Sequence, residues 1–233
     1  MKKFRLLLRK FWDKNKHFML MFYFVFYLAW FISLEQRITT DFHIIHMNID
    51  DYIPFCEFFI VPYLLWFVYI AVVIVYMGFA DKKEYFRLCA FLFTGMTIFL
   101  LISTLWPNGH HLRPFEMPRD NVFTRMVAAL YQTDTATNLW PSIHVYNSLG
   151  CHFAIMKSKH FENRKGIRIA SLILCVSIIM STMFLKQHSV FDVTTAFIMA
   201  TVMYLIVYRS DVLLNLKNSF ENRKRRKPGP ETL

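Results

Sequence analysis

Three short polar segments interrupt the apolar stretches of this chain, and they carry the side chains best suited to chemistry. They are Arg113-Pro114, Pro141-Ser142-Ile143-His144, and the pair His188 and Asp192. The members of the last pair are four residues apart, which places both on one face of a helix. There the carboxylate can accept a hydrogen bond from one imidazole nitrogen and orient the other. This arrangement is typical of a nucleophilic histidine.

The other two segments carry groups that bind anions. Pro141 suits the first turn of a helix, and Ser142 with the free backbone N–H groups beside it offers donors at the positive end of the helix dipole. His144 stands about one turn further along this helix. Arg113 adds a planar cation that can grip phosphate oxygens in two places. Together these residue types indicate a site for a phosphate group.

The polar segments lie among long apolar stretches. The chain has 233 residues, of which 55% are hydrophobic and 18% aromatic. Six charge-free stretches lie within or near the roughly 17–25 residues that a helix needs to cross a bilayer. They are 18–34, 58–80, 88–109, 135–156, 169–185 and 193–208. We therefore expect an all-α integral membrane protein with a six-helix domain over 18–208, flanked by a basic N-terminus (1–17) and a basic tail (209–233).

Two parts of this domain are not explained by the apolar stretches alone. The last stretch is short, so its helix reaches a full span only if it starts near His188 and includes the His/Asp pair; the pair then faces protein or water rather than lipid. The segment 107–134 is too long for a simple turn. Within it, apolar residues from Phe123 to Tyr131 follow helical spacing, which predicts an additional interfacial helix that either packs on the domain or covers the site.

The distribution of lysine and arginine predicts the orientation. With the N-terminus in the cytoplasm, 22 of the 27 basic residues fall on the cytoplasmic side. The positive-inside rule explains this bias, so the net charge of +11 is no evidence for a nucleic-acid partner. Both termini are then cytoplasmic, and all three polar segments meet at the extracytoplasmic face of the cell membrane. The basic tail is read as a solvated topological signal, with contact to anionic lipid headgroups as the alternative.

In their order and spacing, these segments resemble the motifs of the type-2 phosphatidic acid phosphatase superfamily, whose soluble relatives include the vanadium haloperoxidases. That pattern is a lysine separated by six residues from Arg-Pro, then Pro-Ser-x-His, then Ser-Arg separated by five residues from His-x-x-x-Asp. Arg113-Pro114, Pro141 to His144, Ser181 and His188 to Asp192 match it. The resemblance covers about residues 88–208, with the motifs inside 106–192.

Two motif cations are missing, because Trp106 stands at the lysine position and Thr182 at the arginine position. A phosphate monoester carries nearly two negative charges at neutral pH, so fewer cations favour a phosphodiester. The depleted set is more similar to the branch of inositol phosphorylceramide synthases and sphingomyelin synthases. Lys186 is a candidate replacement that would bind the substrate phosphate. Other candidates for the missing charge are His110, His111 and Arg119.

The resemblance implies a mechanism and the role of each residue. His188, oriented by Asp192, would attack phosphorus, and His144 would protonate the departing alkoxide. Arg113, Ser142 and Lys186 would bind the phosphate. The sequence holds no cluster of acids that would bind magnesium, so no metal and no cofactor is expected.

Three functions remain open at the level of sequence. The first is a lipid phosphatase, a membrane phosphohydrolase that cleaves a lipid phosphate ester through a phosphohistidine. The second is a phosphotransferase that moves a headgroup phosphate between lipids. The third, a catalytically silent membrane scaffold, is disfavoured because both histidines and the aspartate are present. A haloperoxidase is disfavoured by the apolar spans and the missing cations.

Overall fold

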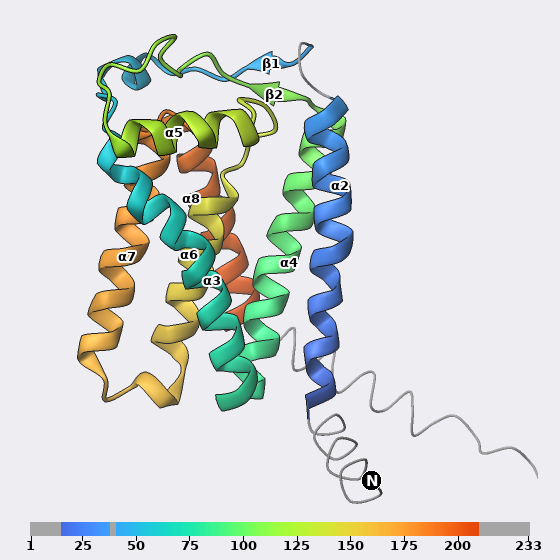
Figure 1. The fold of residues 1–233 in the computed structure, drawn as a ribbon. Helices are drawn as coiled ribbons and strands as arrows, with labels where there is room; N and C mark the ends of the chain where they lie inside the picture. Colours follow the sequence, from blue (N-terminus) through green and yellow to red (C-terminus); the bar gives the residue numbers. More distant parts are fainter. Residues whose placement is uncertain (1–14, 38–40, 210–233) are drawn as a thin grey trace, which may run out of the picture.

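The computed structural model describes residues 15–37 and 41–209 of a mostly helical chain (Figure 1). The basic N-terminus and the basic tail fall almost entirely outside these residues. The helical segments in chain order are η1 (Lys16–Phe22), α2 (Tyr23–Arg37), η2 (Asn48–Tyr52), η3 (Glu57–Phe59), α3 (Ile60–Ala80), α4 (Lys82–Leu105), α5 (Val122–Thr133), α6 (Ile143–Lys157), η4 (Lys159–Phe161), α7 (Lys165–Phe184), α8 (Val190–Tyr204) and η5 (Leu205–Arg209). Two short strands, β1 (His43–Ile44) and β2 (Asn108–Gly109), pair in parallel.

Five continuous helices in the described residues are long and apolar enough to cross a membrane. They are Lys16–Arg37, Glu57–Ala80, Lys82–Leu105, Lys165–Phe184 and Val190–Arg209. Each overlaps one of the six stretches expected from the sequence. The remaining stretch, 135–156, corresponds to α6, which has 15 residues and is shorter than the usual span.

The start that Pro141 and Ser142 predict for this helix is confirmed, because α6 begins at Ile143 with Ser142 as its N-cap, and the first residues of the apolar stretch, 135–140, form a loop. The preceding loop is tied to the first helix instead. Glu35 accepts hydrogen bonds from the backbone N–H and the hydroxyl of Thr135 and from the side-chain amide of Asn138. Polar side chains that find partners in this way favour a loop over a helix.

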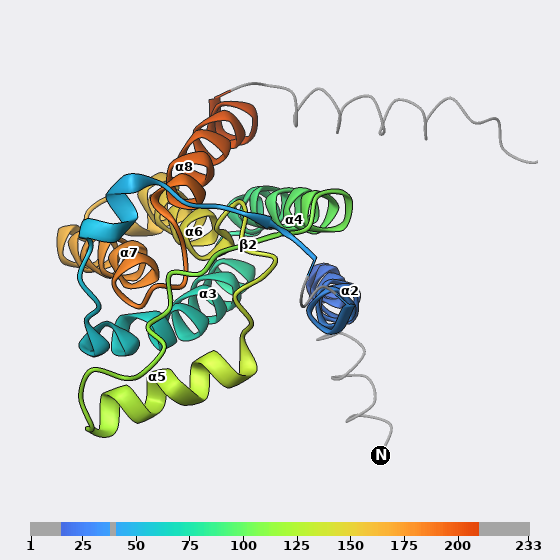
Figure 2. The same cartoon turned by 90° about the horizontal axis from the view of Figure 1, so that it is seen from above.

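The helix α6 lies at the centre of the bundle and packs against α3, α4, α7 and α8 (Figure 2). Small residues allow this close approach. A Cβ atom on Gly95 of α4 would lie 2.0 Å from the ring of Tyr146, and one on Gly150 of α6 would lie 2.6 Å from the ring of Phe91. The two rings stack with centroids 4.6 Å apart. Small residues at helix contacts are typical of bundles in membranes.

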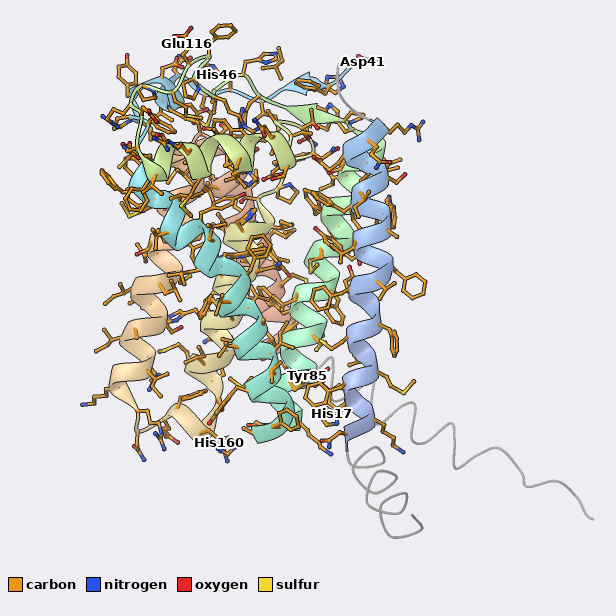
Figure 3. All side chains as sticks on the ribbon, viewed as in Figure 1. His17, Asp41, His46, Tyr85, Glu116 and His160 are labelled. Atoms are coloured by element: carbon orange, nitrogen blue, oxygen red, sulfur yellow. The ribbon has the colours of Figure 1, made fainter. Side chains whose placement is uncertain are left out.

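Polar residues gather at the two ends of the bundle. Figure 3 shows His17, Tyr85 and His160 at one end and Asp41, His46 and Glu116 at the other. The segments 81–87 and 157–168, which the sequence places on one side of the membrane, therefore lie at the same end of the bundle. All three polar segments that predict the site lie at the end marked by Glu116.

The loops at this end hold the start of α6 in place. Strand β2 follows directly after α4, and the side-chain oxygen of Asn108 accepts hydrogen bonds of 2.9 Å from the backbone N–H groups of Leu139 and Trp140. The carbonyl of Asn108 accepts a third bond, from the N–H of Asn138. The end of α4 is thereby fixed to the residues that lead into Pro141 and Ser142.

Candidate active site

Asp192 lies in the first turn of α8, whereas His188 lies just before the N-cap Ser189, so the expected helix that includes both residues is wrong. Both side chains are nevertheless buried and close together. The Nδ1 atom of His188 is 3.4 Å from Oδ2 of Asp192, and the two side chains are 5% and 0% exposed. Ser189 is the N-cap of this helix: its hydroxyl accepts from the N–H of Phe191, while its own N–H donates to Asp192. With its proton on Nδ1, His188 keeps a lone pair on Nε2.

The turn before α8 fixes the backbone of His188. The carbonyl of Thr182, at the end of α7, accepts hydrogen bonds from the N–H groups of Gln187 and His188, at 2.9 and 3.0 Å. Lys186 within this turn has a positive φ of 53°. The Thr182 hydroxyl donates to Ile179 within α7 and is buried. Thr182 therefore holds the His188 turn through its carbonyl oxygen.

The second histidine lies opposite the first. The ring of His144 is in the first turn of α6, with its centroid 5.6 Å from that of His188. It packs between two aromatic rings of α3, stacking on Tyr63 at 4.7 Å and lying 4.4 Å from Trp66. These contacts fix the imidazole plane beside the nucleophile candidate.

Ser142 connects the start of α6 to the start of α8. Its N–H donates to the carbonyl of Asp192 at 3.3 Å, and its hydroxyl caps α6 by accepting from the N–H of Val145 at 3.5 Å. The side chain is fully buried. The N-terminus of α6 therefore lies directly against the start of α8, as an anion site shared by both helices requires.

The guanidinium group of Arg113 reaches the same region from the loop after α4. It donates to the carbonyls of Tyr131 and Thr135, at 3.3 and 2.9 Å, and to the side-chain oxygen of Gln187. It also lies 4.4 Å over the ring of Tyr131, a cation–π contact. Its Nε atom is buried without a partner. The guanidinium group is thus held rigidly next to Gln187, the residue that precedes His188.

The electrostatics keep His188 neutral. Burial, together with the positive charge of Arg113, lowers the pKa of His188 to about 3. A neutral imidazole is the form that can attack phosphorus. Burial also lowers the pKa of His110 to about 4. His110 bonds through Nε2 to the Gln187 carbonyl at 2.9 Å, so it supports the same turn.

The proposed replacement cations have other partners. The ammonium group of Lys186 donates to the carbonyl of Asp50 at 2.7 Å. Arg119 forms a two-pronged ion pair with Glu57, with N–O distances of 2.7 and 2.6 Å. His111 lies on the surface near the ring of Phe42. Lys186 and Arg119 therefore stabilise segments around the site.

Arg119 gives a stability prediction. Replacing Arg119 by Ala leaves the Glu57 carboxylate, which is 0% exposed, with the amide of Asn121 as its side-chain partner. We expect the thermal midpoint to fall by several degrees, because a buried carboxylate without its cation is costly. Arg125→Ala is the matched control, since its pair with Asp120 is solvent-exposed and contributes little. Equal thermal midpoints in the two variants would contradict this stabilising role of Arg119. The KM for a phosphate substrate should change in neither variant.

Several residues that the sequence reasoning missed complete the site. Asp50 accepts from the Ser189 hydroxyl at 2.6 Å and from the N–H of Val190 at 2.8 Å, so it holds the start of α8. Asp134 accepts from the hydroxyl of Tyr63 at 3.0 Å and from the amide of Gln187 at 3.4 Å. Burial raises the pKa of Asp134 to about 6. Of these residues, Gln187 could have been found from the sequence, because it directly precedes His188.

The described residues thus bring Arg113, Ser142, His144, His188 and Asp192 together at one end of the bundle. Across 15–37 and 41–209, no three His, Cys, Asp or Glu side chains gather in a way that could hold a metal ion. No family model matches the chain, and no curated protein or solved structure is significantly similar to it.

Proposed function

We propose that this chain is a membrane enzyme that transfers a phosphoryl group from a lipid phosphate ester to water, with His188 as the nucleophile. The observation that carries the proposal is the buried His188–Asp192 pair with a second imidazole, His144, at 5.6 Å between ring centroids. Ionisable groups buried at the end of apolar helices are expensive and commonly functional. Membership in the type-2 phosphatidic acid phosphatase superfamily is part of this proposal and rests on the sequence motifs.

The chemistry balances with these residues. The Nε2 lone pair of His188 forms a bond to phosphorus, the bond from phosphorus to the lipid oxygen breaks, and His144 gives a proton to that oxygen. Water then attacks the phosphohistidine, and its proton goes to His144, which regenerates both histidines. Asp192 stabilises the positive charge that develops on the His188 ring. Arg113 and the N-terminus of α6 would stabilise the phosphoryl oxygens.

A second candidate is a phosphotransferase, in which a lipid alcohol replaces water in the second step. The two residues that stand in place of the missing motif cations favour this candidate. Trp106 is half exposed and packs edge-on against the ring of Trp140 at 5.6 Å, and the Thr182 side chain bonds within α7. Neither can supply charge to the phosphate. Arg113, whose charge acts on His188, is then better matched to a singly charged phosphodiester than to a monoester.

The proposal includes a topology of six spans, with α6 as a short central span that is surrounded by other helices. It places both termini in the cytoplasm and the site at the extracytoplasmic face. The bias of basic residues supports this orientation, since ten of the 15 described lysines and arginines belong to the end marked by His160. In Figure 1, α5 lies across the opposite end, roughly perpendicular to the long helices, as an interfacial helix would.

Surface labelling tests the orientation. In a Cys56→Ser background, where the other cysteines are buried, Glu116→Cys should react with a membrane-impermeant maleimide on intact cells. His160→Cys should react only after permeabilisation, because both positions are exposed but at opposite ends of the bundle. The reverse pattern would contradict the orientation, and labelling of both on intact cells would contradict the spanning arrangement.

The function itself is tested with purified full-length protein and a panel of phospholipids, with and without diacylglycerol or ceramide, followed by mass spectrometry. Release of inorganic phosphate, or of the phosphorylated headgroup into water, identifies a phosphohydrolase. A new phospholipid that contains the added alcohol identifies a phosphotransferase. Unchanged lipids across the panel would overturn both candidates and favour the silent scaffold.

A further inference from the structure

An apolar cavity of about 570 Å³ lies beside the candidate active site, between side chains of α2, α3, α4, α5 and α6. This volume falls within the range of pockets that bind small molecules. Along α3 the lining runs from Tyr63 to Val75, about 18 Å at 1.5 Å per residue. His144 lines the cavity near the Tyr63 end. A long, narrow apolar ligand could therefore extend from the site into the bundle.

The cavity opens toward the outer face of the bundle between α2 and α3. Three of its lining side chains, Leu28, Phe67 and Val75, are at least half exposed on the surface of these helices. That surface belongs to two of the helices apolar enough to cross a membrane. A ligand that enters here comes from the hydrocarbon interior of a bilayer.

Polar atoms without a partner are concentrated in this cavity. Of ten such buried side-chain atoms in the described residues, four belong to its lining: the hydroxyl of Tyr27, Nε1 of Trp66, Nδ1 of His144 and Oδ1 of Asn147. Tyr27 is 6% exposed and Asn147 is 2% exposed. Buried polar groups normally find a hydrogen-bond partner, and each exception calls for an explanation such as a missing ligand.

The chemistry of these four atoms defines their partner. The indole N–H donates, the amide oxygen accepts, and the hydroxyl and the imidazole nitrogen can do either. The described lining contains no lysine or arginine, and its one carboxylate, Asp134, already accepts from Tyr63 and Gln187. An anionic headgroup would find no countercharge here. Uncharged hydroxyl and carbonyl groups would satisfy all four atoms.

We propose that this cavity binds an uncharged lipid alcohol that carries ester or amide carbonyl groups, with its hydroxyl oxygen beside His144. The inference rests on the proposed function and deepens it, because it names the lipid on the His144 side of the reacting phosphorus. The phosphate lies on the side of Arg113, and the alcohol enters between α2 and α3. The alcohol is either the group released from phosphorus or the acceptor that takes the phosphoryl group, and both use the same contacts.

Photolabelling tests the cavity directly. Purified full-length protein in detergent micelles is irradiated with a diacylglycerol that has an alkyl diazirine at the end of one acyl chain, and adducts are mapped by mass spectrometry. In the wild type, adducts should fall on α2 and α3. Ala71→Trp fills the cavity from α3 and should remove most of this labelling. Val68→Trp is the matched control, on an exposed position of α3 that does not line the cavity. It should label like the wild type.

One comparison defines the ligand. Asn147→Leu should lower labelling by the diacylglycerol while leaving labelling by a diazirine-bearing alkane unchanged, since only the diacylglycerol needs the amide. Equal labelling of the wild type and Ala71→Trp would overturn the cavity as the site. Equal labelling of the wild type and Asn147→Leu by the diacylglycerol would overturn the role of the uncharged polar atoms in binding the alcohol.

The labelling result can be distinguished from the result of the test of the proposed function. His188→Ala should bind and label like the wild type, so a failure of catalysis leaves the cavity result standing, and a failure of labelling leaves the histidine chemistry standing. In turnover assays, added diacylglycerol that acts as the released group should inhibit competitively. Diacylglycerol that acts as the acceptor should appear in a new phospholipid. Ala71→Trp should suppress whichever effect is seen, while Val68→Trp should not.

Discussion

Replacing His188 by Ala is expected to abolish turnover of lipid phosphate esters, by at least about 10⁴-fold, because the bond to phosphorus can then no longer form on the enzyme. The same change should remove the acid-labile phosphoenzyme seen on rapid quenching with labelled substrate. The matched control is His46→Ala, an exposed histidine at the same end of the molecule that pairs with Asp51. It should keep full activity. Near-normal turnover in His188→Ala would contradict the nucleophile assignment.

A second histidine variant separates the two roles. His144→Gln should lose turnover of a lipid substrate but keep much of the phosphoenzyme formation from p-nitrophenyl phosphate, whose leaving group needs no proton. His188→Ala should fail with both substrates. If the two variants respond alike to the activated leaving group, His144 is not the proton donor. Thermal midpoints close to that of the wild type would show that both variants are folded.

The sequence predicted the meeting of the polar segments for a physical reason. The four-residue spacing of His188 and Asp192 predicted one helix that contains both, but α8 begins at Val190 and His188 lies before its N-cap. The alternation of apolar stretches carries Arg113, Ser142 and the His/Asp pair to the same end of a bundle. The structure confirms this shared end through the bond from the N–H of Ser142 to the Asp192 carbonyl. Hydropathy was sufficient for that part of the site, whereas the contact between His188 and Asp192 depends on the turn before α8.

The contacts that hold the site were not predictable in the same way. Asp50 caps α8 from η2, about 140 residues away, and Glu35 of α2 holds the loop before α6. Such partners depend on the tertiary path of the chain, which hydropathy does not encode. For the same reason, the charges of Lys186 and Arg119 were visible in the sequence while their partners were not. The apolar stretch 135–156 is longer than α6, because the loop residues before Pro141 are uncharged and resemble part of a span.

The cavity and the histidines suggest a division of the site into two sides. Arg113 and the turn of His188 form a polar side, whose groups suit the phosphoryl oxygens. Tyr27, Trp66 and Asn147 line an apolar side with uncharged polar atoms. His144 belongs to both, since its ring faces His188 and also lines the cavity. A proton donor for a lipid oxygen needs this position, between the reacting phosphorus and the hydrocarbon.

Asp192→Asn is expected to lower kcat by about 10³-fold while leaving KM and the thermal midpoint nearly unchanged. In the structure, Oδ2 of Asp192 accepts from both His188 and the N–H of Ser189, while Oδ1 has no partner. An asparagine oxygen at the Oδ2 position can keep both bonds, so the cap of α8 and the orientation of the imidazole survive. What disappears is the negative charge that stabilises the imidazole ring as it becomes positive on bonding to phosphorus.

The size of this effect separates catalysis from structure, because a merely structural role would lower the thermal midpoint together with the activity. Asp51→Asn is the control, an exposed aspartate at the same end of the molecule that should keep wild-type kcat. The phosphoenzyme gives a further readout: Asp192→Asn should form it more slowly, with the label still on His188. An unchanged kcat would remove Asp192 from the mechanism. A lower kcat with a collapsed midpoint would assign the aspartate to the helix cap instead.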